Sequence, residues 1–184
     1  MQLRVTIAAA LVALGYSAGA SADSIGITLG NDVIAADYGT NLRTADLTFG
    51  GLYNRDNKNR YADVGLLAHG ESMSGGRTEV GVGGRLYGAH ADDQDLVGLA
   101  LGAQVRWFPG PAPIALAGYA FYAPRVITGV DGKIFWDASA RVEWEIVRNT
   151  ASAFVGYRKT RAEFDNGQKS DLDKSAYIGM QMKF

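Results

Sequence analysis

The sequence predicts an all-β protein: an antiparallel, up-and-down transmembrane β-barrel of 8–10 strands that follows a cleaved signal peptide. Three observations support this prediction. The first residues have the three parts of a secretory leader, the rest of the chain alternates repeatedly between apolar and polar residues, and the last segment alternates up to a terminal phenylalanine.

The leader comprises residues 1–22. Arg4 supplies the positive n-region, residues 5–14 (VTIAAALVAL) form an uncharged apolar run, and residues 20–22 (ASA) match the small-residue rule for cleavage before Asp23. The run is too short for a spanning helix, and a buried N-terminal helix is the weaker alternative because the three elements occur in order. We expect export, with residues 23–184 as one mature barrel domain.

Composition excludes several classes of function. The 184 residues include 18 basic and 19 acidic side chains. The chain therefore lacks the basic excess that would indicate nucleic-acid binding. There is no cysteine, and His69 and His90 are the only histidines. A Cys-based nucleophile or metal site is therefore impossible and a His-rich one is unlikely to form, so we expect no cofactor and no bound metal.

Alternation with period two recurs along the mature chain, as in a strand with two different faces. Nine segments show it: 24–38, 44–54, 60–70, 76–88, 94–108, 113–124, 134–147, 151–163 and 174–184. Bacterial single-chain barrels have even strand numbers. Residues 24–38 can form a hairpin that turns at Gly30-Asn31-Asp32, which gives ten strands, or fail to span, which gives eight. The turn chemistry favours ten.

The apolar faces carry aromatic residues near the segment ends, as expected for the aromatic girdles of a membrane barrel. Trp136 and Trp144 are eight residues apart, which is roughly 26 Å along a strand and roughly 20 Å along the membrane normal after a tilt of about 40°. The predicted girdle comprises Tyr53, Trp107, Tyr122, Trp136, Trp144, Tyr157 and Phe184.

The opposite faces carry charges of both signs among many glycines. In a barrel these side chains would line the lumen and pair there, because an unpaired buried charge is costly. The predicted lumen network comprises Asp46, Asp63, Glu79, Arg85, Arg106, Asp137, Arg141, Glu143, Glu145, Arg158 and Lys183. A soluble barrel would reverse the two faces and put the charges in water. The separators also predict longer polar loops at one end (54–60, 88–95, 128–133, 163–174) and tighter turns at the other.

The last segment, 174–184, has Ile178, Met180, Met182 and Phe184 on one face. This pattern resembles the last strand of bacterial outer-membrane barrels, which the outer-membrane assembly machinery reads. A chain can also end in mid-strand when its last strand pairs with its first and leaves no free edge.

Three stretches look like the YfaZ-type outer-membrane proteins: SIGITLGND (24–32), FVGYRKTRAEF (154–164) and SAYIGMQMKF (175–184). The resemblance covers nearly the whole mature chain. It implies a small outer-membrane barrel of Gram-negative bacteria without an established activity, so it assigns no functional residue.

Three further sets of polar residues have side chains that could take part in catalysis or bind cations. Residues 69–72 (HGES) bring an imidazole, a carboxylate and a hydroxyl together, but alternation points His69 and Glu71 to one face and Ser72 to the other, which favours a polar turn over a catalytic site. Glu143 and Glu145 share a face about 7 Å apart, which favours structural pairing with arginine over acid–base catalysis. The clusters Asp92-Asp93-Asp95 and Asp165-Asp171-Asp173 could collect divalent cations, although solvated loops are favoured.

The expected function is that of a small, non-enzymatic protein of the Gram-negative outer membrane with a structural, envelope or surface-interaction role. The alternatives are a lipid-modifying barrel enzyme, a narrow porin-like channel for ions or solutes, and a soluble periplasmic β-protein. We expect a monomer whose partners are outer-membrane lipid, lipopolysaccharide and, through the last strand, the assembly machinery, with no nucleic acid.

Overall fold

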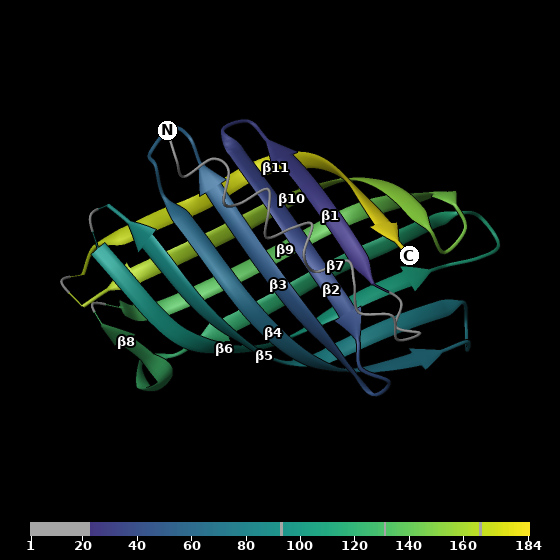
Figure 1. Cartoon of the computed structure of the whole chain (residues 1–184), viewed down its shortest axis with the longest axis horizontal. Helices are drawn as coiled ribbons and strands as arrows, with labels where there is room; N and C mark the ends of the chain where they lie inside the picture. Colours follow the sequence, from purple (N-terminus) through teal and green to yellow (C-terminus); the bar gives the residue numbers. More distant parts are fainter. Residues whose placement is uncertain (1–22, 93, 131, 166) are drawn as a thin grey trace.

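The computed structural model describes residues 23–92, 94–130, 132–165 and 167–184. It is an all-β protein in which ten antiparallel strands form a closed barrel, as the sequence predicts (Figure 1). The predicted leader, residues 1–22, lies outside the described residues. No helix in the described part of the chain is long and apolar enough to cross a membrane.

The strands follow one another around the barrel wall and pair with their neighbours in the sequence. Their bounds are β1 Ser24–Gly30, β2 Val33–Asn41, β3 Ala45–Asn54, β4 Arg60–Ser72, β5 Arg77–Ala91, β6 Gln94–Phe108, β7 Ile114–Ala123, β8 Thr128–Val130, β9 Gly132–Val147, β10 Ala151–Phe164 and β11 Lys169–Lys183.

Pairing of β1 with β11 closes the barrel, with Ser24 opposite Lys183 and Gly30 opposite Tyr177. Beyond these pairs the backbone of Asp23 exchanges two hydrogen bonds with Phe184, at 2.9 and 2.8 Å. The last strand therefore has no free edge, which is the predicted reason why it can continue to the C-terminus. We call the end of the barrel that carries Asp23 and Phe184 the terminal end, and the opposite end the distal end.

The hairpin predicted at Gly30-Asn31-Asp32 is present, since β1 ends at Gly30 and β2 begins at Val33. This hairpin turns the nine predicted segments into ten wall strands. One element was not predicted: after β7 the chain makes a short 3-10 helix, Arg125–Ile127, and then β8 pairs with residues 96–98 of β6. The β8 segment continues the position of β7 along β6, so it adds no further strand to the wall.

The predicted difference in loop length between the two ends is wrong. Residues 88–95 and 163–174 were expected to be loops, but β5 runs to Ala91, β6 starts at Gln94, β10 runs to Phe164 and β11 starts at Lys169. In these stretches many outward residues are polar or charged, and most inward residues, such as Ala89, Ala91, Phe164 and Leu172, are small or apolar. The backbone therefore keeps its sheet hydrogen bonds where the composition suggests a polar loop.

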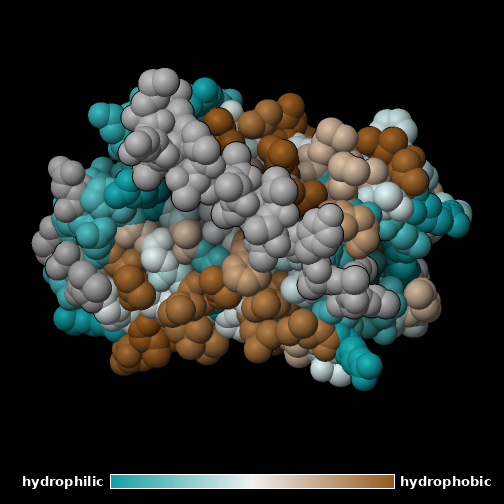
Figure 2. Space-filling view, viewed as in Figure 1, coloured by the Kyte–Doolittle hydropathy of each residue, from teal (hydrophilic) through white to brown (hydrophobic). Residues whose placement is uncertain are grey.

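The outer face of the wall is apolar around the middle of the barrel and polar at both ends (Figure 2). Large apolar side chains are highly exposed there: Leu66 is 54% exposed, Leu101 57% and Ile178 61%. In β9 the outward residues from Trp136 to Ile146 include no charged side chain, whereas Asp137, Glu143 and Glu145 on the inward face are buried. The apolar face is thus the outside of the barrel.

The distal half of the lumen is filled by an apolar plug. Tyr87 and Phe135 stack with ring centroids 4.0 Å apart, and Tyr61 stacks on the same Phe135 at 5.7 Å. The larger of the other buried side chains in this cluster are Leu67, Leu96, Phe121, Phe164 and Leu172, and small alanines such as Ala89 and Ala162 fill the space between them. At the distal side of the plug Asn59 of the β3–β4 loop, only 1% exposed, donates a hydrogen bond to Ser170 Oγ at 3.2 Å and ties this loop to β11 across the distal mouth.

Candidate functional site

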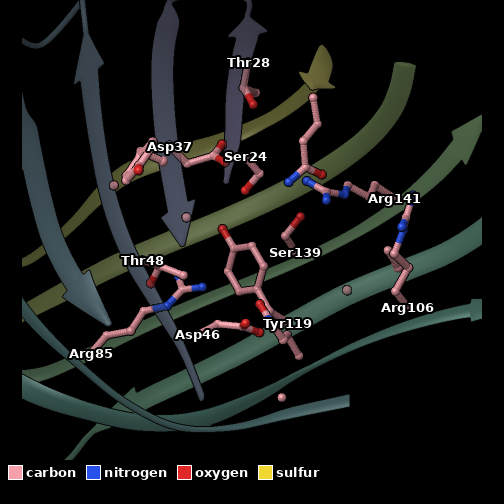
Figure 3. Close-up of a pocket in the computed structure, with 18 of the residues that line it drawn as sticks. Ser24, Thr28, Asp37, Asp46, Thr48, Arg85, Arg106, Tyr119, Ser139 and Arg141 are labelled. Carbon is pink, nitrogen blue, oxygen red and sulfur yellow. The ribbon is translucent and has the colours of Figure 1, made fainter. Parts of the chain in front are cut away.

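The terminal half of the lumen holds a polar cavity of about 490 Å³. It reaches from Tyr61 and Tyr177 beside the plug to Glu71 and His69, which are exposed near the terminal end. Figure 3 shows side chains from opposite walls pointing into it, including Asp37 from β2, Arg85 from β5 and Arg141 from β9. The barrel is therefore sealed distally and open toward its terminal end.

Glu143 is the centre of an ion-pair network in the cavity wall. Its carboxylate is 0% exposed and accepts hydrogen bonds from Arg106 Nε at 2.5 Å and Arg141 Nε at 2.7 Å. Arg106 also lies 3.5 Å from Glu79 and 3.7 Å from Glu145. Such charge-assisted bonds satisfy charges that could not otherwise be buried.

Arg85 occupies a second cluster, deeper in the lumen and against the plug. Its guanidinium lies 3.9 Å from Asp63 and 3.9 Å from Asp137, and it stacks on the ring of Phe121 at 4.0 Å. Its Nε is buried and has no hydrogen-bond partner among the described residues, and the same holds for Thr48 Oγ1. At 3.9 Å these contacts are longer than direct hydrogen bonds, so charge attraction and the stacking on Phe121 hold the guanidinium.

Arg158 and Asp173 form a third pair. Arg158 Nε donates to Asp173 Oδ2 at 2.6 Å, and Ser175 Oγ donates to the other carboxylate oxygen at 2.6 Å. Asp173 is only 2% exposed because a bulge in the β10–β11 pairing lies between Thr160 and Arg161. The bulge turns both Leu172 and Asp173 inward.

Lumen glycines are paired in register with bulky inward side chains on the neighbouring strand. Gly179 pairs with Phe154, and a Cβ at Gly179 would overlap the Phe154 ring. The same relation joins Gly26 to Asp37, Gly50 to Asp63, Gly65 to Arg85 and Gly102 to Phe121. Each of these glycines leaves the space that its neighbour's side chain fills, which is how a ten-stranded barrel accommodates so many large lumen groups.

Comparison with protein families now places the chain. The model of the family described as "YfaZ precursor" matches residues 1–184. The chain belongs to this family. No curated protein matches it. The family description as a precursor is in keeping with a leader ahead of the barrel, and the suspected YfaZ-type resemblance is confirmed.

In this YfaZ-family barrel all the charged residues proposed for the lumen belong to the inward faces. Most of these charged residues form the three clusters around Glu143, Arg85 and Arg158 that are described above. Asp46 accepts a hydrogen bond from Asn41 at 2.9 Å and lies 3.4 Å from His69 Nδ1. Lys183 lines the cavity at its terminal end.

The proposed girdle residues lie on the outer face in two groups. Trp107, Trp144 and Phe184 are near the terminal end, and Trp144 and Phe184 are 65% and 66% exposed. The distal group comprises Tyr53, Tyr122, Trp136 and Tyr157. In the last strand Ile178, Met180, Met182 and Phe184 are all exposed on the outer face.

Sequence reasoning left several lumen charges out of the predicted network, among them Asp37, Arg77 and Asp173. Asp37 lies in the predicted segment 24–38. Val33 and Ala35 share its face, so the alternation could have predicted that Asp37 points into the lumen. Arg77 lies at the start of the predicted segment 76–88, on the same face as Glu79, and bonds Glu145 at 3.1 Å. No periodic signal could have found Asp173, because the bulge changes the period in front of it.

The remaining polar residues considered from the sequence pair mostly with other side chains of the barrel. His69 contacts Asn41 and Asp46, while Ser72 belongs to the outward face. Of the second acidic cluster, Asp165 pairs with Arg125 at 3.2 Å, and Asp171 and Asp173 with their own arginines. Asp95 bonds His90 Nδ1 at 2.7 Å, and the neighbouring Asp93 lies outside the described residues. The described part of the chain contains no metal-binding group of His, Cys, Asp and Glu.

Proposed function

We propose that this protein is a small integral protein of the Gram-negative outer membrane, non-enzymatic, with a structural or surface-interaction role in the envelope. One observation carries the proposal: a closed barrel has an uncharged apolar belt outside, aromatic residues at both edges of the belt, and its charges inside. A soluble protein would expose this continuous apolar surface to water at high cost, whereas lipid covers it without cost.

The plug supports a structural role over the porin-like alternative. Phe135, Tyr87 and Phe164 are at most 2% exposed, so the distal half of the lumen is packed like a protein core. A solute that enters the cavity from the terminal end meets this core. Conduction would require its displacement.

The placement of Ser72 and His69 supports a non-enzymatic role over the lipid-modifying alternative. A serine nucleophile needs a base within hydrogen-bond reach. Ser72 and His69 belong to opposite faces of β4, and the ring of His69 is directed to Asn41 and Asp46. We expect His69→Ala to leave the lipid A composition of the cells unchanged, and an altered acylation pattern would contradict the non-enzymatic role.

Heat-modifiability tests the main proposal. The full chain is expressed with its leader, membranes are fractionated, and unboiled and boiled samples are compared on SDS gels. We expect the protein in the outer-membrane fraction, with faster migration when unboiled because the closed barrel resists detergent. A protein recovered without detergent in the periplasmic fraction would overturn the proposal and favour a soluble β-protein.

The same proposal assigns the partners. Outer-membrane lipid and lipopolysaccharide would contact the belt, a monomer suffices because the barrel has no open edge, and the assembly machinery would recognise Ile178, Met180, Met182 and Phe184. Phe184→Ser should reduce the folded, heat-modifiable fraction in cells without preventing refolding of the purified chain in detergent. Equal folding in cells would contradict a recognition role for Phe184.

A further inference from the structure

Two lysines face each other directly on the outside of the barrel wall. Lys159 of β10 is paired in register with Lys174 of β11. Both side chains are on the outer face, since they continue the outward series of Val155 and Tyr157 and of Ile178 and Ala176. Like charges directly opposite each other in an antiparallel pair destabilise the sheet. Neither lysine forms a direct ion pair with a described residue: the nearby carboxylates Asp171 and Glu163 are paired with Arg161 and Lys169.

The position of this pair in the wall is specific. On β10 and β11 these are the first charged residues on the outer face distal to the apolar belt, one outward position beyond Tyr157 and Ala176. Lys159 Nζ lies 5.2 Å from the ring centroid of Trp136, a distal girdle residue on β9. The lysines therefore stand at the height where the belt ends and lipid headgroups would begin.

The local charge balance is positive. One step further from the belt, Arg161 Nε and Nη2 bond Asp171 at 2.5 and 3.2 Å, and this bond, together with both lysines, lowers the pKa of the Asp171 carboxyl. The three cations and one carboxylate leave about two positive charges on this patch. Glu163, the next outward carboxylate, is engaged by Lys169 at 3.0 Å.

We propose that Lys159 and Lys174 form a binding site for a phosphate group of lipid A, with Arg161 at its distal edge. A phosphate between the two ammonium groups would replace their repulsion by two charge-assisted hydrogen bonds. The acyl chains of the same lipid would lie on Tyr157, Ala176 and Ile178 directly beneath. This inference rests on the proposed location in the outer membrane with the terminal end on the periplasmic side, so that the lysines at the distal end meet the outer leaflet, which contains this lipid.

The test compares the purified full-length barrel in neutral detergent with and without lipid A. Three forms are used: wild type, Lys159→Gln/Lys174→Gln, and the control Lys169→Gln, which removes a lysine of the same hairpin that already has a partner. Each form is heated without lipid, with bisphosphorylated lipid A, with the same lipid A after removal of its phosphates, and with inorganic phosphate. Loss of heat-modifiability reports unfolding.

We expect bisphosphorylated lipid A to raise the unfolding temperature of wild type and of Lys169→Gln, and dephosphorylated lipid A and inorganic phosphate to raise neither. The double variant should lose the gain, with apparent affinity about tenfold or more weaker for each lysine removed. Without lipid it should be at least as stable as wild type, because the repulsion is gone. This reversal of sign cannot arise from a purely structural role.

Equal gains in all three forms, or a double variant that is already less stable without lipid, would overturn the inference. A wild-type gain with inorganic phosphate alone would overturn the commitment to a lipid. These results are distinguishable from failure of the proposed function. In that case the chain would be soluble without detergent and would show no heat-modifiable band in any lipid condition.

Discussion

Replacing Glu143 by glutamine should destabilise the barrel strongly, although it changes neither shape nor volume. The carboxylate is 0% exposed and accepts from both Arg106 and Arg141. Breaking a buried pair by removing one partner costs about 3–5 kcal/mol, because an uncompensated charge remains. Arg106 retains Glu79 at 3.5 Å and Glu145 at 3.7 Å, and Arg141 retains its stacking on Phe154, at 4.4 Å. We therefore expect the low end, about 3 kcal/mol.

The assay is reversible urea unfolding in lipid vesicles, with the free energy of unfolding extrapolated to zero denaturant. Glu71→Gln is the control: it makes the same change at an exposed carboxylate of the same cavity, and should cost less than about 0.5 kcal/mol. The double variant Glu143→Gln/Arg141→Gln should recover part of the loss, since it removes the unpaired charge. A Glu143→Gln loss equal to that of Glu71→Gln would refute the reasoning, and would mean that solvent in the cavity compensates both arginines.

Three further results are expected. Gly179→Ala should lower the free energy of unfolding by about 1–3 kcal/mol, and with it the unfolding temperature, because the new Cβ would overlap the ring of Phe154 on the neighbouring strand. Gly70→Ala, with open space around it, should not. The Arg161–Asp171 bond lowers the pKa of the Asp171 carboxyl in the folded state. The small stabilisation that this bond gives is therefore complete above the unfolded pKa of about 4 and is lost as the pH falls through the lower folded pKa. If the stability advantage of wild type over Arg161→Gln grew on acidification, this expectation would be wrong. In planar bilayers wild type should give no discrete conductance, and Phe135→Ala, at a cost of about 3–5 kcal/mol, should produce it; a conducting wild type would show that the plug does not seal the lumen.

Alternation predicts the wall of this barrel well because lumen and exterior make opposite demands on neighbouring residues. In β9 each outward residue from Trp136 to Ile146 is apolar or small and the inward ones from Asp137 to Glu145 are polar, so the period is visible in the letters alone. The number of strands followed from one turn, Gly30-Asn31-Asp32, together with the requirement for an even count.

The period fails as evidence where both faces change character. Beyond Ala176 the outward residues of β11 are Lys174, Asp171 and Lys169, so the stretch has the composition of a loop although it is still a paired strand. The bulge in front of Asp173 then shifts the parity of β11, and a single unpaired residue of this kind has no signature in a hydrophobic pattern. The partners of each lumen charge were also beyond prediction, because they depend on which strands face each other across the barrel.

The plug and the cavity have a common origin in the pairing of glycines with bulky side chains. In the distal half the side chains opposite or beside glycine are aromatic, as with Gly102 and Phe121 or Gly98 and Tyr87, and they meet in the centre as a core. In the terminal half they include acids such as Asp37 and Asp63, opposite Gly26 and Gly50, whose charges favour a hydrated centre over an apolar core. The same wall geometry thus seals one half and keeps the other open, according to the chemistry of the residue that each glycine accommodates. A conducting relative of this barrel would therefore need polar residues in place of the distal aromatics, with the glycines unchanged.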